Sequence, residues 1–203
     1  MTHFRRIFRR TLPAVLAAGL TAGLTACSSS DPSVWTLSAV PGSAIAGGPA
    51  TVEVLTPAVP QGLDRDRIVL ADTGSRLKIS SSDAWSEALG MEIGHALTSD
   101  LTGRLPGSTV FSQADGMGGT AALVVESVIR RFTRDGSGTA ILEMQYTIKR
   151  ASDKAPSPGR LVRLTAPAGG STQAFVTAFS RLLGEAADRI AEDIRAVQPA
   201  RYP

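Results

Sequence analysis

The sequence predicts an α+β fold, in which two long amphipathic helices pack on one face of a mostly antiparallel sheet. Residues 83–105 and 171–194 each carry apolar side chains at helical spacing along one side. Residues 139–149 alternate apolar and polar side chains, which is typical of a strand with one buried and one wet face. The order of strands, helix, strands and helix places both helices against the same sheet.

Local signals set the expected bounds of these elements. Asp83 is the expected N-cap of the first helix, and Pro106-Gly107 ends it. Ser171 or Thr172 is the expected cap of the second helix. Turn residues at 72–74 and 135–138 predict two hairpins. The expected strands are short runs rich in apolar residues, at 34–37, 51–55, 67–70, 76–79, 109–111, 121–132, 139–149 and 160–165.

The first 26 residues have the features of a secretory signal peptide. Four arginines, without any acidic residue, precede an apolar run at 12–24 that is too short for a bilayer, which needs roughly 20 residues. Thr25-Ala26-Cys27 then places small side chains before the only cysteine, and this resembles the bacterial lipobox. The resemblance implies that Cys27 becomes the first mature residue and carries acyl chains such as palmitate.

The predicted organisation is a signal peptide at 1–26, a lipidated Cys27 with a flexible tether at 27–33, and one domain at 34–198. Without the four arginines of the signal peptide, 17 basic and 18 acidic residues remain, so the mature chain is nearly neutral. This balance argues against nucleic acid as a partner. A lipidated Cys27 leaves no thiol for a disulfide or a cysteine metal site.

The residues offer little for catalysis or cofactor binding. His95 is the only histidine outside the signal peptide, and no Gly-x-Ser-x-Gly motif presents a serine nucleophile. The glycine-rich stretch 116–119 lacks the Lys-Ser/Thr of a phosphate-binding loop. Gly169-Gly170 precedes a helix, where a plain N-cap is favoured over an anion site. We therefore predict no enzymatic activity, no cofactor and no metal site.

Several short motifs resemble a known family by their order and spacing. Trp35-Thr36-Leu37 follows the lipobox, and Val52-Glu53-Val54 and Leu63-Asp64-Arg65 lead into Ile68-Val69. Trp85-Ser86-Glu87-Ala88-Leu89 then opens a helix that ends at Leu105-Pro106. Together these resemble the ABC-type transport auxiliary lipoproteins, the PqiC-like family associated with MCE-domain proteins.

The resemblance implies a non-enzymatic role beside an MCE-domain protein and its ABC transporter, which move lipids or other apolar molecules across the envelope. The implied location is the inner leaflet of the outer membrane, facing the periplasm. The candidate partner-binding residues are Trp35, Leu63, Asp64, Arg65 and Ile68. An exposed edge strand at Trp35 makes strand addition by a partner or a second copy a hypothesis. A lipid-binding acceptor and, more remotely, an envelope hydrolase stay open as alternatives.

Overall fold

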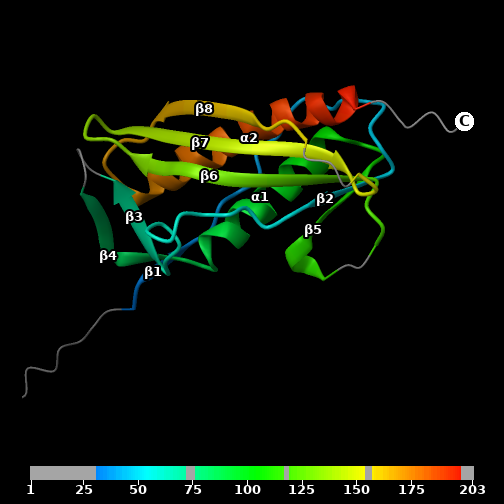
Figure 1. Ribbon diagram of the computed structural model, residues 1–203. Coiled ribbons are helices and arrows are strands. Elements are labelled where there is room, and N and C mark those ends of the chain that lie inside the picture. The colour runs from blue at the N-terminus through cyan, green and yellow to red at the C-terminus, as the bar shows by residue number, and fades with distance from the viewer. Residues whose placement is uncertain (1–30, 72–75, 117–118, 154–156, 198–203) are drawn as a thin grey trace, which may run out of the picture. The chain divides into compact units, whose positions relative to one another are not determined.

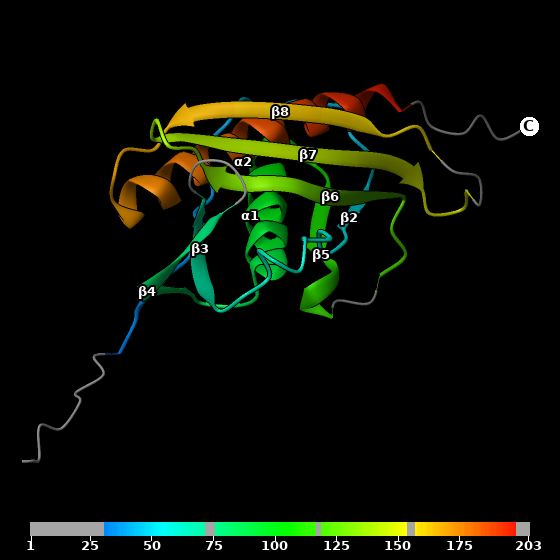
Figure 2. The ribbon, with the colours of Figure 1, turned by 60° about the vertical axis from the view of Figure 1, so that its left-hand side comes forward.

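The computed structural model describes residues 31–71, 76–116, 119–153 and 157–197. They belong to one compact unit that spans residues 31–203. The predicted signal peptide, Cys27, the turn 72–74 and part of the glycine-rich stretch 116–119 lie outside the described residues. The predicted α+β class is confirmed, with both helices behind the larger sheet (Figures 1 and 2).

The larger sheet has five strands in the order β5-β2-β6-β7-β8. The long ladders of β6 with β7 and of β7 with β8 are antiparallel, while β2 pairs in parallel with both β5 and β6. Its strands are β2 (Thr51–Val54), β5 (Thr109–Ser112), β6 (Leu123–Arg134), β7 (Thr139–Arg150) and β8 (Arg160–Pro167). A short 3-10 turn, η1 (Gln113–Asp115), follows β5.

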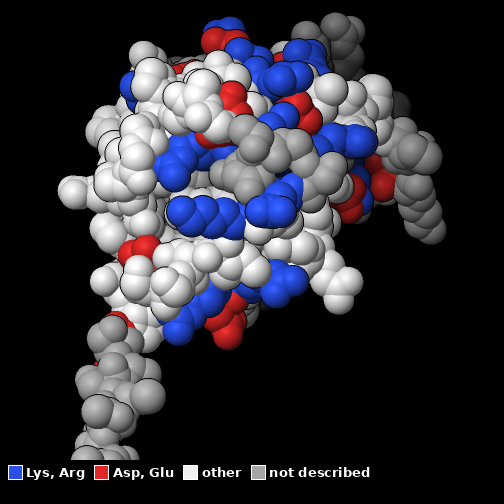
Figure 3. Space-filling view, turned by 90° about the vertical axis from the view of Figure 1, so that its left-hand side faces the viewer, with Lys and Arg blue, Asp and Glu red and all other residues white. Residues whose placement is uncertain are grey.

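A second sheet of three strands stands beside one end of the first, whereas the sequence predicts a single sheet (Figure 1). Its order is β1 (Ser33–Trp35), β4 (Leu77–Trp85) and β3 (Arg67–Ala71). The predicted hairpin of β3 and β4 is confirmed, and β1 adds to β4 in parallel. Lys and Arg side chains gather on the end of the molecule that carries this hairpin (Figure 3).

The predicted start of the first helix is wrong. Asp83 lies in β4, where it pairs with Ser33 of β1, and α1 spans Leu89–Arg104. β4 continues through Ala84 and Trp85, which also pair with β1, so the chain after Asp83 stays extended and no helix begins there. The second helix, α2 (Thr172–Ala196), begins as predicted, since the hydroxyl of its N-cap Ser171 accepts a hydrogen bond from the Ala174 amide.

Aromatic side chains fill the space between the helices and the sheet. Phe132 of β6 stacks on Phe179 of α2 with ring centroids 3.8 Å apart, and Phe175 lies 4.6 Å from Phe179. Trp85 meets Phe132 edge-on at a ring-centroid distance of 6.2 Å and is buried in the core. On β7 the predicted apolar face is buried at Leu142, Met144 and Tyr146 and half-buried at Ile148. Buried apolar side chains of both helices and of the larger sheet belong to one hydrophobic cluster.

Candidate functional site

The segment that follows β1 crosses both helices on the side away from the larger sheet, and we call residues 36–45 the strap (Figure 1). The strap has no regular secondary structure, so helix side chains satisfy its backbone groups. The Leu37 amide donates to Glu92 Oε2 of α1 at 3.0 Å. The Ser38 amide donates to the Ser180 hydroxyl of α2 at 3.1 Å. The strap is therefore held by both helices at once.

Arg104, the last residue of α1, joins the strap to α2 although its side chain is only 2% exposed. Its guanidinium donates to the carbonyl oxygens of Val40 at 2.9 Å and of Gly184 at 2.9 Å. Its Nε also donates to the carboxylate of Asp188 at 2.5 Å. A planar group with five donors suits such a junction, because one side chain can serve several fixed acceptors.

Asp100 lies one turn before Arg104 on α1 and is also buried. One of its carboxylate oxygens accepts the Val40 amide at 2.6 Å and lies 3.6 Å from Arg104 Nη1. Burial raises the pKa of Asp100 to about 6, although the Val40 hydrogen bond and the charge of Arg104 both act to lower it. Asp100 therefore titrates in a range in which ordinary aspartates stay ionised.

Asp83 connects the start of the chain to α2. Its carboxylate accepts hydrogen bonds from Trp35 Nε1 at 2.8 Å, Ser80 Oγ at 2.7 Å and Thr172 Oγ1 at 2.9 Å. Burial acts to raise the pKa of Asp83, but these bonds and one from Ser82 outweigh it and lower the pKa. Trp35 is therefore half-buried and fixed in place, at the edge of the three-stranded sheet.

The other predicted partner-binding residues divide between surface and core. Asp64 and Arg65 are exposed on a turn, where Arg65 Nε donates to the Gly62 carbonyl at 3.1 Å. Leu63 is 6% exposed and Ile68 is fully buried, so both side chains pack in the core under this turn. The structure thus leaves Asp64, Arg65 and part of Trp35 for direct contact, and binding by this set stays a prediction.

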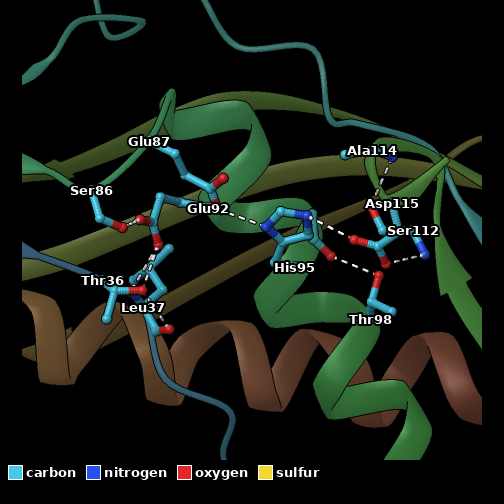
Figure 4. A network of polar contacts seen from close by, with 11 residues as sticks. Thr36, Leu37, Ser86, Glu87, Glu92, His95, Thr98, Ser112, Ala114 and Asp115 are labelled. Carbon is cyan, nitrogen blue, oxygen red and sulfur yellow. Dashed lines mark hydrogen bonds and ion pairs between the residues drawn. The ribbon is translucent and has the colours of Figure 1, made fainter.

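His95 lies between two carboxylates on the flank of α1 (Figure 4). Its Nδ1 is 2.6 Å from Glu87, and its Nε2 is 3.3 Å from Asp115 of η1. A histidine that acts as a base needs one ring nitrogen aimed at a nucleophile, and here both nitrogens face acidic groups. The arrangement ties η1 to α1 and offers no catalytic triad.

Other candidate chemistries gain no support within the described residues. No group of three or more histidine, cysteine or acidic side chains there could hold a metal ion. The stretch at 169–172 acts as a helix cap through Ser171. No helix in the part of the chain that the structure describes is long and apolar enough to cross a membrane.

Comparison with known proteins identifies the family. Residues 35–191 match the family described as the ABC-type transport auxiliary lipoprotein component. The chain belongs to this auxiliary lipoprotein family. The resemblance inferred from the motifs is thus confirmed, and membership makes the chain a lipoprotein associated with ABC-type transport. The family is one of transport components.

Solved structures share the fold of this auxiliary lipoprotein. An uncharacterised protein of 15% sequence identity superposes with a TM-score of 0.67, covering 81% of this chain and 99% of its own. A Xanthomonas campestris protein, assigned to a family of unknown function, superposes with a TM-score of 0.64 at 17% identity, covering 82% of this chain and 94% of its own. A search of curated proteins gives no match. At these identities the structures show a common fold.

Proposed function

We propose that this chain is a lipid-anchored docking module of an MCE-type transport system that moves lipids or other apolar molecules across the envelope. The family match over 35–191 is the observation that carries the proposal. In this proposal, Cys27 holds the protein in the inner leaflet of the outer membrane, and the domain faces the periplasm. The partner is the MCE-domain protein that bridges the membranes, together with its ABC transporter.

The fixed strap supports a docking role. Hydrogen bonds from both helices hold residues 36–40, and Asp83 holds Trp35, so the domain is rigid from its first strand onward. The tether predicted at 27–33 then joins this rigid domain to the lipid on Cys27. A rigid surface also loses little conformational entropy when a partner binds.

The candidate contact surface is the exposed turn at Asp64 and Arg65, which immediately precedes β3 of the three-stranded sheet. Asp64 and Arg65 present opposite charges beside each other, and their side chains are exposed. Exposed charges of this kind steer association and set specificity more than they raise affinity. We place the partner contact at this turn and at the exposed part of Trp35.

Co-purification from membranes tests the proposal. The lipidated full chain, tagged at its C-terminus, is expected to retain the MCE-domain protein of the same organism. Exchanging the charges with Asp64→Arg and Arg65→Asp is expected to weaken retention at least about tenfold, as like-charge contacts replace attractive ones. The matched control exchanges Arg181 and Glu185 on α2, an exposed pair 3.8 Å apart. Equal retention by both exchanged variants would rule out this surface, and no retention by the wild type would refute the docking role.

A further inference from the structure

Arg76 and the first three residues of β4 form an exposed stretch of alternating basic and apolar side chains. Arg76 and Lys78 are exposed, and between and after them Leu77 and Ile79 are 47% and 45% exposed. These two are among the few large apolar side chains that the described surface leaves open to water. Because successive side chains of a strand point to opposite faces, Arg76 and Lys78 lie on one side of this edge and Leu77 and Ile79 on the other. Apolar area and attraction of basic side chains to anionic lipid are the two contributions to binding at a membrane surface.

The open edge of β4 makes this stretch accessible. β1 pairs with β4 only at Asp83, Ala84 and Trp85, and β3 occupies the other side of β4. Within the described residues, the preceding part of β4 therefore has no strand along one edge. Proteins usually protect such an edge with charges or a covering segment, and here two apolar side chains remain exposed beside the charges.

Positive charge surrounds this stretch. Figure 3 shows Lys and Arg side chains gathered near the middle of this end of the molecule. β6 ends here at Arg134, and its end lies beside the end of β3 in Figures 1 and 2. The mature chain as a whole is nearly neutral, so this basic end is a local feature. A basic end matches an anionic phospholipid surface in charge.

The chain direction brings this end towards the anchor. Because β1 runs parallel to β4, the chain enters β1 from the side on which β4 begins at Leu77. Six residue steps separate Cys27 from Ser33, and a chain of this length reaches at most about 20 Å when fully extended. A lipid on Cys27 would therefore keep the start of β1 within that distance of the bilayer. At such a distance, even a weak second contact is favoured by its high effective concentration.

We propose that residues 76–79 are a second membrane contact, which binds anionic phospholipid headgroups through Arg76 and Lys78. Leu77 and Ile79 enter the interface between headgroups and acyl chains. The contact orients the domain on its membrane, so that the turn at Asp64 and Arg65 is presented at a fixed angle. The orientation rests on the lipid anchor of the proposed function, whereas the binding itself needs no anchor.

Vesicle sedimentation tests the contact without the anchor. The protein is residues 27–203 with Cys27→Ser, and the vesicles are phosphatidylethanolamine with phosphatidylglycerol, compared with phosphatidylcholine alone. We expect binding to the anionic vesicles only. Replacing Arg76 and Lys78 by Gln is expected to weaken it about 25-fold, since a basic residue near an anionic surface contributes about fivefold. Replacing Leu77 and Ile79 by Ser is expected to weaken it about tenfold.

Two controls separate this contact from general stickiness. Leu161→Ser removes a 66% exposed apolar side chain from β8, and Lys149→Gln removes a charge on β7. Neither change is expected to alter vesicle binding. Absence of binding to anionic vesicles, or equal binding by wild type and the 76–79 variants, would overturn the inference. The docking role would be unaffected by that result, because it is tested separately by retention of the MCE-domain protein on the lipidated chain. If the 76–79 variants lose the MCE-domain protein but bind vesicles as the wild type does, the edge of β4 is a protein contact. That result would also overturn the proposed membrane contact.

Discussion

Replacement of Arg104 by Met tests whether the strap is an integral part of the fold. The change keeps most of the aliphatic volume and removes every donor of the guanidinium. The carbonyl oxygens of Val40 and Gly184 then lose their buried partner, and Asp100 loses the neighbouring positive charge. The strap would thereby lose a principal attachment to both helices.

The structure sets the size of the effect. Removing one member of a buried charged network typically costs about 3–5 kcal/mol, because the remaining groups stay buried without partners. Arg104 is 2% exposed and Asp100 is fully buried, although Asp188 is 49% exposed and can turn to water. We therefore expect Arg104→Met to lower the free energy of unfolding by about 3 kcal/mol, at the lower end of that range.

Urea unfolding followed by tryptophan fluorescence measures this change. Trp35 lies just before the strap and Trp85 lies in the core, so the signal reports on both regions. The control is Arg181→Met, because Arg181 is exposed and faces Glu185 at 3.8 Å; we expect a change within about 0.5 kcal/mol. A loss below about 1 kcal/mol for Arg104→Met would refute the inference that this network holds the strap.

Four further substitutions test other contacts of the two helices. Gly103→Ala should stabilise α1 by about 0.8 kcal/mol, since nothing lies within 4 Å of the added carbon. Gly184→Ala should be at least about 1 kcal/mol less stable than Gly103→Ala, since its added carbon would lie 3.0 Å from Val40. Equal stabilisation by the two substitutions in thermal unfolding would contradict this. The raised pKa of Asp100, about 6, means that the folded state binds its proton more tightly. Wild type should therefore gain stability relative to Asp100→Asn as the pH falls from 7.5 to 4, by at most about 3 kcal/mol, whereas a pH-independent difference would contradict the assignment. Tyr146→Phe should cost about 1–2 kcal/mol in urea unfolding, because the hydroxyl donates to Asp193 at 2.6 Å, and an unchanged midpoint would contradict that.

Local sequence patterns predicted most elements of the fold, and non-local pairing explains the errors. The alternation in β7 and the helical spacing in α2 depend on residues close in sequence, and both predictions are confirmed. Asp is a preferred residue type at a helix N-cap, but Asp83 pairs with β1 and lies in a strand. The parallel pairing of β2 with β5 joins residues far apart in the chain, so no local sequence pattern predicts it.

The candidate site shows the same division. Asp64 and Arg65 are exposed, as expected of charged residues in a turn, whereas Leu63 and Ile68 pack beneath it. The strap was not predicted, because residues 36–45 have neither helical nor strand periodicity beyond the short run expected at 34–37. Its signal lay in α1, where three charged residues flank the apolar stripe and are all buried: Glu92, Asp100 and Arg104. Buried charges need partners, and these are supplied by the strap and α2.

The mass of the mature N-terminus tests the central claim most directly, since both the docking role and the orientation of the domain on its membrane assume a lipid on Cys27. The full chain, expressed in a bacterium and extracted from membranes with detergent, is digested and its N-terminal peptide is measured by mass spectrometry. We predict a peptide that begins at Cys27 and carries acyl chains, and a Cys27→Ser chain that lacks them. A mature protein that begins elsewhere, or an unmodified Cys27, would contradict the account.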